Sequence, residues 1–127
     1  MNNHAGFQTE IEFELPKGYL DESGALHRRG TMRLATAADE ILPLRDPRVQ
    51  QNEAYLAVIV LARVITRLGT LSEIHTGTIE GLYASDLAYL QRVYDKFNRV
   101  DDDQEMALEK RPTGTNVFER LAARGEA

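Results

Sequence analysis

The chain has 127 residues, of which 43% are hydrophobic and 28% are charged, and its formal net charge is −5. This length and composition are typical of one globular domain with a modest core. The negative charge argues against a nucleic-acid-binding surface, which needs clustered positive charge. The absence of cysteine excludes disulfides, thiolate catalysis and cysteine-based zinc sites.

The sequence gives no indication of a membrane segment or an export signal. Its longest apolar run, residues 54–65, is too short to cross a bilayer and contains Arg63. The first ten residues lack a basic segment followed by an apolar run. We therefore expect a cytoplasmic protein with no membrane partner.

A β-hairpin is predicted over residues 7–34. Residues 7–15 alternate between apolar and mostly acidic side chains, which is typical of a half-buried strand. A turn signal follows at residues 21–24, and residues 26–34 predict the returning strand. Its inner face is expected to hold Leu26, Met32 and Leu34, and its outer face His27, Arg29, Thr31 and Arg33. An acidic and a basic outer face would then lie side by side and fix the register of the hairpin.

Helices are predicted over residues 37–98. The Asp46-Pro47 pair gives a capping residue followed by a proline at the first helical position. From there we expect one long helix over residues 47–68, ending at Gly69. Residues 54–65 of this helix are apolar nearly all round, so they should be covered on most sides, in the core of the domain or of an oligomer.

Residues 79–98 carry a helical apolar stripe with Asp86 in its middle. As one helix, this segment would bury an unpaired carboxylate at a cost of several kcal/mol. We therefore expect the helix to break at Ala84-Ser85, so that Ser85 caps a new helix over residues 86–98. Asp86 then lies in the first turn, where the helix dipole favours an acid. The alternative is a buried functional carboxylate.

The two main helices supply the predicted core. Its members are Leu56, Ile59, Val60, Val64, Leu90, Val93 and Phe97. Together with the hairpin, they predict an α+β fold in which an N-terminal antiparallel β-hairpin packs on a small helical domain. We expect residues 1–100 to form this single domain.

Residues 101–127 are predicted to be an acidic linker and a short amphipathic tail. This segment holds seven acidic and four basic residues, and three apolar residues near its end share one helical turn and a half. They are too few to fold alone, so they either dock into a groove on a neighbouring chain or form a frayed terminus. With two tyrosines of residues 79–98, they are the candidate partner-binding residues: Tyr83, Tyr89, Val117, Phe118 and Leu121.

No motif indicates catalysis, a cofactor or a metal. His4, His27 and His75 lie far apart on unlike elements. The acidic run at residues 101–105 lacks the glycine and glutamate of a calcium-binding loop. A glycine-rich phosphate fingerprint and a nucleophile elbow are also absent from the sequence. We therefore expect no catalytic, cofactor-binding or metal-binding residues.

The order of the elements, a hairpin followed by LGTLSEIHTGTIEGLYASDLAYLQRVYDKFN, resembles the phage tail assembly chaperone family of Mu-like and P2-like contractile-tailed phages. The resemblance covers residues 7–98 and follows a Leu-Gly-x-Leu-Ser turn, an acidic residue and spaced leucines before a final aromatic. The matching positions are Leu68, Gly69, Leu71, Ser72, Glu73, Ile74, Leu82, Asp86, Leu87, Leu90 and Phe97. The segment MRLATAADEILPLRDPRV is also similar to small tail-assembly proteins of contractile injection systems.

The resemblance implies a non-enzymatic chaperone that binds the tape-measure protein, or another tail protein, until the tail tube polymerises. From the charge, the motifs and the apolar helix described above, we expect no nucleic-acid partner and no cofactor, and a homo-oligomer is possible. The alternative is a structural subunit retained in the finished tail or baseplate. A chaperone is absent from mature particles, whereas a subunit is present at fixed stoichiometry. A small enzyme is the third and least favoured hypothesis.

Overall fold

The computed structural model describes residues 8–99. Within this part of the chain, a three-stranded antiparallel sheet and several helices form an α+β fold, as the sequence predicted. The strands lie in the order β1-β2-β3, with bounds β1 Glu10–Leu20, β2 Leu26–Arg33 and β3 Ile65–Leu68. Phe7 and the predicted linker and tail, including Val117, Phe118 and Leu121, lie outside the described residues.

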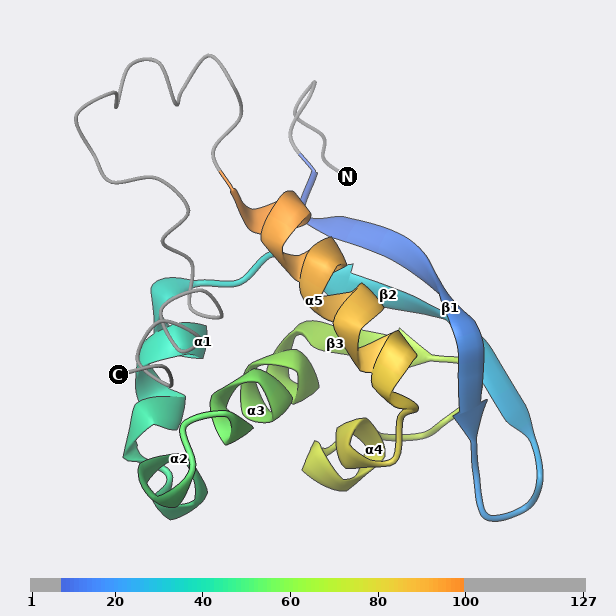
Figure 1. Ribbon diagram of the computed structural model, residues 1–127. Helices are drawn as coiled ribbons and strands as arrows, with labels where there is room; N and C mark the ends of the chain where they lie inside the picture. Colours follow the sequence, from blue (N-terminus) through green and yellow to red (C-terminus); the bar gives the residue numbers. More distant parts are fainter. Residues whose placement is uncertain (1–7, 100–127) are drawn as a thin grey trace.

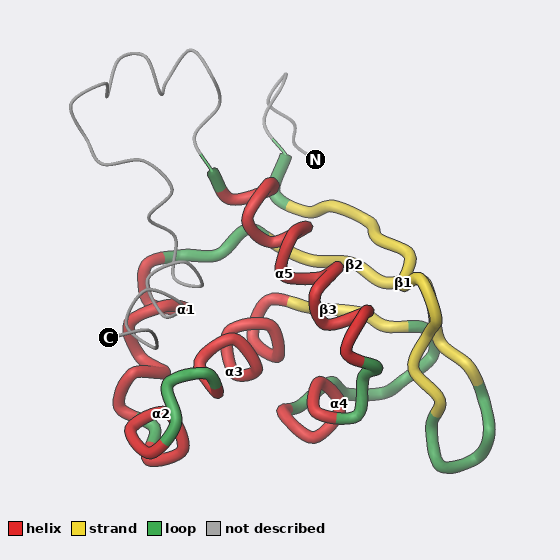
Figure 2. The backbone as a smooth tube through the Cα atoms, viewed as in Figure 1, coloured by secondary structure: helices red, strands yellow, loops and turns green. Residues whose placement is uncertain are grey.

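The helices lie at one end of the sheet and across it (Figure 1). Their bounds are α1 Ala37–Ile41, the 3₁₀ helix η1 Leu42–Arg45, α2 Pro47–Gln51, α3 Tyr55–Val64, α4 Thr76–Glu80 and α5 Ala84–Asn98. α5 packs across β1 and contacts α3, and α3 leads directly into β3. Figure 2 shows that the hairpin loop projects at one end of the molecule, whereas α1 and α2 lie at the other.

The predicted pairing of an acidic with a basic outer face is confirmed over residues 10–14 of the hairpin. Glu10 lies opposite Arg33, and Glu14 lies opposite Arg29. The outer faces of the two strands therefore carry opposite charges, which favours this pairing over a shifted one.

β1 is longer than the sequence predicted. It does not stop at Leu15 but passes through a bulge between Glu14 and Tyr19 and continues to Leu20, with a shift of register against β2. The bulge ends at Gly18, whose φ of 103° is a conformation that other residues rarely adopt. Pro16 and Gly18 are residues that often end a strand, but here they lie within the bulge, and the strand continues beyond them.

The predicted faces of β2 are wrong at its first two residues. His27 is buried, whereas Leu26 is exposed over 55% of its surface. The His27 ring is held on both sides, because Nε2 lies 2.7 Å from Oδ2 of Asp21 and Nδ1 accepts a hydrogen bond from the Thr70 N–H at 3.3 Å. Satisfied polar atoms allow this ring to be buried. The hydrogen bond to His27 is also the main cause of the lowered pKa of Asp21.

The single long helix predicted over residues 47–68 is also wrong, first because it breaks at residues 52–54. Asn52 leaves the helical conformation, with φ −151° and ψ 102°. Its side-chain oxygen accepts a hydrogen bond from the Ala54 N–H at 3.1 Å. Such local side-chain bonds compete with helix continuation, so α2 ends at this asparagine and α3 begins as a separate helix.

The second error is at the end of that helix, where the chain becomes a strand. From Ile65 the backbone pairs with β2, and Thr31 lies opposite Arg67. The β-branched side chains of Ile65 and Thr66 suit a sheet better than a helix. Gly69, with φ 58°, ends this strand and not a helix. The hairpin thus gains a third strand, which completes the sheet.

The core lies between the sheet, α3 and α5. Most of α3 is buried, as its apolar sequence predicted. Five of the predicted core residues are buried, namely Leu56, Ile59, Val60, Val64 and Leu90. Val93 and Phe97 are only partly buried and pack against the edge of this core. Phe13, Leu15, Met32 and Tyr94 are buried in the same cluster.

The predicted break before α5 is confirmed, but its cap is not the predicted one. α4 ends at Glu80 and α5 begins at Ala84, with Tyr83 at the capping position. Ser85 therefore lies inside the helix, and its predicted capping role is wrong. Asp86 does lie in the first turn of α5, yet it is fully buried.

The Asp86 carboxylate holds the bulge of β1. It accepts hydrogen bonds from the Gly18 N–H at 2.7 Å and from the Lys17 N–H at 3.1 and 3.2 Å. The Ser85 hydroxyl donates a further bond at 3.3 Å. A buried carboxylate is stable when backbone donors surround it in this way. Asp86 is therefore a structural acid that fastens α5 to β1.

Candidate partner-binding surface

Residues 36–45 expose their large apolar side chains and bury their first acid. Ile41, Leu42 and Leu44 are exposed over 57%, 45% and 46% of their surface, whereas Asp39 is exposed over only 2%. An ordinary surface helix turns its apolar stripe towards the core, so this segment is inverted. The three exposed side chains are called the α1–η1 apolar surface below.

Local sequence signals fix both ends of this segment. At its start, the Thr36 N–H donates to the Asp39 carboxylate at 2.7 Å, in a capping-box arrangement. At its end, the Asp46 carboxylate accepts from the Arg48 N–H at 2.8 Å and so opens α2. Because both ends are capped, α1 and η1 form although each is too short to be stable alone.

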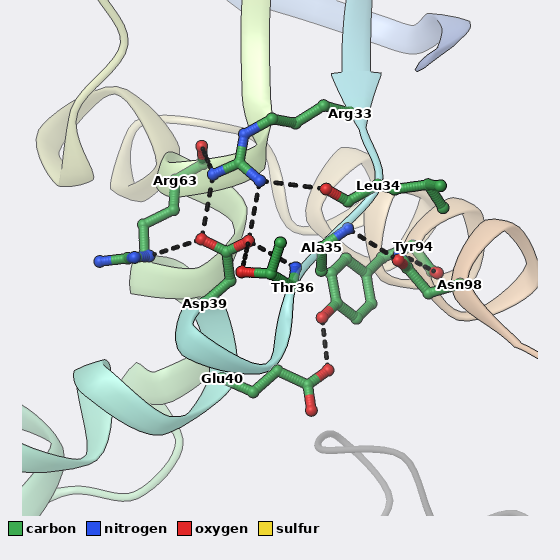
Figure 3. A network of polar contacts seen from close by, with 9 residues as sticks. All are labelled: Arg33, Leu34, Ala35, Thr36, Asp39, Glu40, Arg63, Tyr94 and Asn98. Carbon is green, nitrogen blue, oxygen red and sulfur yellow. Dashed lines mark hydrogen bonds and ion pairs between the residues drawn. The ribbon is translucent and has the colours of Figure 1, made fainter. Parts of the chain in front are cut away.

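An ion-pair cluster under α1 sets which side of the segment faces outward (Figure 3). The Arg33 guanidinium donates to both oxygens of Asp39, at 2.8 and 3.0 Å, and Arg63 Nε donates to one of them at 2.9 Å. Arg33 lies at the end of β2 and Arg63 in the last turn of α3. The hydrogen bond from Arg33 is the main cause of the strongly lowered pKa of Asp39. Asp39 is therefore ionised and holds α1 to the sheet and to α3.

α5 holds the same segment from a second side. The Tyr94 hydroxyl donates to the Glu40 carboxylate, and the Ala35 N–H donates to the Asn98 side-chain oxygen at 2.9 Å. Burial, and then the hydrogen bond to Glu40, raise the pKa of Tyr94, so this hydroxyl keeps its proton. With contacts from β2, α3 and α5, the segment cannot turn its apolar side inward without breaking several polar contacts.

Arginine side chains follow the α1–η1 apolar surface along the chain. Arg45 is exposed directly after Leu44. Arg48 forms an ion pair with Asp46 at 2.9 Å, and its guanidinium lies 4.9 Å from the centre of the Tyr55 ring. An apolar partner with an acidic flank matches this arrangement of aliphatic and basic groups.

A smaller apolar site lies on the hairpin. Leu20 and Leu26 face each other across β1 and β2 and are exposed over 54% and 55% of their surface. They lie next to the hairpin loop, at the far end of the molecule from α1 (Figure 1). Leu20 and Leu26 therefore suit a control for the α1–η1 apolar surface, because they are about equally exposed and lie at the other end of the molecule.

The structure separates the two tyrosines that the sequence put forward. Tyr83 is exposed over half of its surface, at the capping position of α5, and so remains available to a partner. Tyr89 is partly buried against the core, and its hydroxyl accepts a hydrogen bond from the Glu14 N–H at 3.2 Å. The role of Tyr89 is thus to support β1. The other candidates, Val117, Phe118 and Leu121, lie outside the described residues.

The sequence reading did not identify Ile41, Leu42 or Leu44 as candidates. The available signal was the run Ile-Leu-Pro-Leu between Glu40 and Arg45. That run is too short for a helical period to show which side is buried. Its orientation depends on Arg33 and Arg63, which come from other elements.

Across residues 8–99, no group of three or more histidine or acidic side chains could hold a metal ion. Of the two histidines in that range, His27 is bound as described above, and His75 caps α4 by accepting from the Gly77 N–H at 3.1 Å. In the same range no helix combines the length and hydrophobicity needed to cross a membrane. Compared with known proteins, the chain matches no protein-family model, no curated protein and no solved structure.

Proposed function

We propose that this protein is a non-enzymatic tail assembly chaperone that acts during assembly of a contractile phage tail or a phage-tail-like injection particle. Its client is the tape-measure protein or another tail protein. The resemblance of residues 7–98 to that chaperone family supports the class of client. The α1–η1 apolar surface, held outward by the ion pairs of the buried Asp39, is the observation that carries the binding role.

The size of this surface suits a weak and reversible contact. Fully burying an exposed leucine or isoleucine stabilises a complex by about 1.5–3 kcal/mol. Ile41, Leu42 and Leu44 are already about half buried, so each can add about 1 kcal/mol. The three together give about 3 kcal/mol, far less than the ~12 kcal/mol of a nanomolar complex. A chaperone must release its client when the tube forms, and a modest contact allows this release.

An amphipathic helix is the client segment that fits best. α1 and η1 form a short helical ridge, and helices pack on such ridges through aliphatic residues spaced three and four apart. Acidic residues beside the aliphatic ones would lie near Arg45. Such a segment would otherwise leave its apolar side in water, which is the condition that a chaperone prevents.

Co-expression with the neighbouring tail proteins, followed by pull-down, tests this proposal. The test variant is Ile41→Ser/Leu44→Ser, which makes the α1–η1 apolar surface polar. The matched control is Leu20→Ser/Leu26→Ser, which changes side chains of similar exposure at the other end of the molecule. We expect the test variant to capture several-fold less client and the control to capture as much as the unchanged protein.

Equal capture by the test variant and the unchanged protein would remove the α1–η1 apolar surface from the proposal. The role itself is tested on purified mature particles. Absence of the chain from these particles supports a chaperone. Its presence at fixed stoichiometry would overturn the chaperone role in favour of a retained tail or baseplate subunit.

A further inference from the structure

The end of the described chain lies beside the start of the α1–η1 segment. Asn98 is the last residue of α5, and its side-chain oxygen accepts a hydrogen bond from the Ala35 N–H at 2.9 Å. Ala35 comes directly before Thr36, the capping residue of α1. The chain after residue 99 therefore continues from a point beside the start of α1 (Figure 3).

The chain after that point is long enough to reach the surface with slack. An extended chain spans about 3.3 Å per residue, so the residues between Arg99 and Val117 span up to roughly 60 Å. The helical segment they would have to pass, residues 37–45, is only about 15 Å long at the usual helical rise. Geometry therefore allows residue 117 and its neighbours to lie anywhere along this segment.

The chemistry of the chain's end matches the surface. Val117, Phe118 and Leu121 are spaced so that one helical turn and a half presents them together. Asn116 and Glu119 provide the signals that start such a turn. The segment also holds one acid, Glu119, and one base, Arg120, so it carries no net charge and the match with the surface is apolar.

We infer that residues 116–122 cover the α1–η1 apolar surface of their own molecule. The covalent link decides between this occupant and a second copy, because a segment tethered within reach of its site has an effective concentration in the millimolar range. A second copy reaches that concentration only in very concentrated solution. If the proposed function is correct, this cover also regulates it, because a client must displace residues 116–122.

A paramagnetic label tests the inference without a client. The chain has no cysteine, so Ala123→Cys gives one site for a nitroxide on the full-length protein. We expect the methyl signals of Ile41, Leu42 and Leu44 to lose most of their intensity. The signals of Leu20 and Leu26, at the far end of the molecule, should keep theirs. Adding Phe118→Ser and Leu121→Ser to the labelled chain should restore the lost intensity.

Two results would overturn the inference. One is equal loss, or no loss, at the two groups of methyl signals. The other is loss that appears in an isotope-labelled, nitroxide-free chain when unlabelled nitroxide-bearing chain is added, since that contact is made between molecules. The matched control is Met106→Ser/Leu108→Ser, which removes apolar side chains of the same tail outside residues 116–122 and should leave the intensity loss unchanged. Client pull-down is a separate measurement, so failure of the cover leaves the proposed function standing, and the reverse also holds.

Discussion

α3 and the α1–η1 segment are both rich in aliphatic residues, yet the protein uses them in opposite ways. α3 buries Leu56, Val60, Leu61 and Val64 almost completely. The α1–η1 segment turns its aliphatic residues outward and its acid inward. Apolar content alone therefore does not decide what is buried. In the α1–η1 segment, the polar partners of the buried Asp39 decide which side faces inward.

The two regions also differ in how a substitution destabilises them. A helix like α3 is held by close packing, where each lost methylene leaves a cavity. The α1–η1 segment is held by Asp39 and by hydrogen bonds to α5. An ionised carboxylate buried without partners is very unfavourable, so its arginine partners select one orientation. The following variants are arranged to test this contrast.

The largest effect is expected from Leu61→Ala in α3. Leu61 is fully buried, and truncating such a leucine costs about 2–5 kcal/mol of unfolding free energy. Urea denaturation followed by circular dichroism measures this change. A loss below 1 kcal/mol, small for this class of truncation, would mean that α3 is not closely packed.

A smaller but clear effect is expected from Asp86→Asn. The amide has one acceptor oxygen where the carboxylate has two, and its NH₂ group would face the N–H groups of Lys17 and Gly18. Losing hydrogen bonds to a buried charge costs about 1.5–3 kcal/mol. The same denaturation experiment applies, with Arg92→Ala at an exposed position of α5 as the control, expected to change stability by less than about 0.5 kcal/mol. If Asp86→Asn leaves stability unchanged, the hydrogen bonds from Lys17 and Gly18 to Asp86 do not stabilise the fold.

Asp39→Asn should reveal the ionic anchor of α1 through pH. Arg33 keeps the pKa of Asp39 below its ordinary value, so the folded protein binds this proton less readily than the unfolded chain. The resulting stability is complete above the unfolded pKa of about 4 and is lost as the pH falls towards the lower folded value. Thermal unfolding from pH 6 to pH 2 should show a smaller loss for Asp39→Asn than for the unchanged protein.

The matched acid for this comparison is Asp46, whose pKa is also lowered, mainly by Arg48. Asp46 is more exposed than Asp39. Asp46→Asn should therefore reduce the acid-dependent loss of stability less than Asp39→Asn does. Parallel pH curves for Asp39→Asn and the unchanged protein would show that Asp39 contributes nothing to the orientation of α1.

The smallest effect on stability is expected from Ile41→Ser. Ile41 is exposed over 57% of its surface, and substitutions of exposed residues change stability by about 0.5 kcal/mol or less. Differential scanning calorimetry of this variant beside Leu61→Ala measures the contrast directly. A loss comparable to that of Leu61→Ala, if it persists when Phe118→Ser/Leu121→Ser removes the proposed cover, would mean that Ile41 packs inside the domain and that the outward orientation is wrong.

Features set by neighbouring residues could be predicted from the sequence. They include the α+β class, the charge-matched register of the hairpin, the start of α2 at Asp46 and the break before α5. Each depends on a pattern within a few residues, such as alternation or a capping side chain. The sequence reading placed the cap of α5 at Ser85, two residues too late.

Features set by distant partners could not be predicted. Ile65 becomes part of a strand because β2 lies beside it, more than thirty residues earlier in the chain. Asp86 finds its donors in β1, and Asp39 finds Arg63 in α3. The candidate surface was missed for the same reason. Nothing within residues 36–45 indicates that their acid will be the buried side.

The hydrogen bonds between the Asp86 carboxylate and the bulge of β1 also affect how the newly made chain folds. Gly18 and Asp86 are 68 positions apart, and Ala35 and Asn98 are 63 apart. Contacts over such distances form late and slow the completion of a fold. Synthesis proceeds from the N-terminus, so β1 is made before α5 and is not covered by that helix until α5 has also been made. During that interval the nascent protein itself exposes the kind of apolar surface that we propose it covers on its clients.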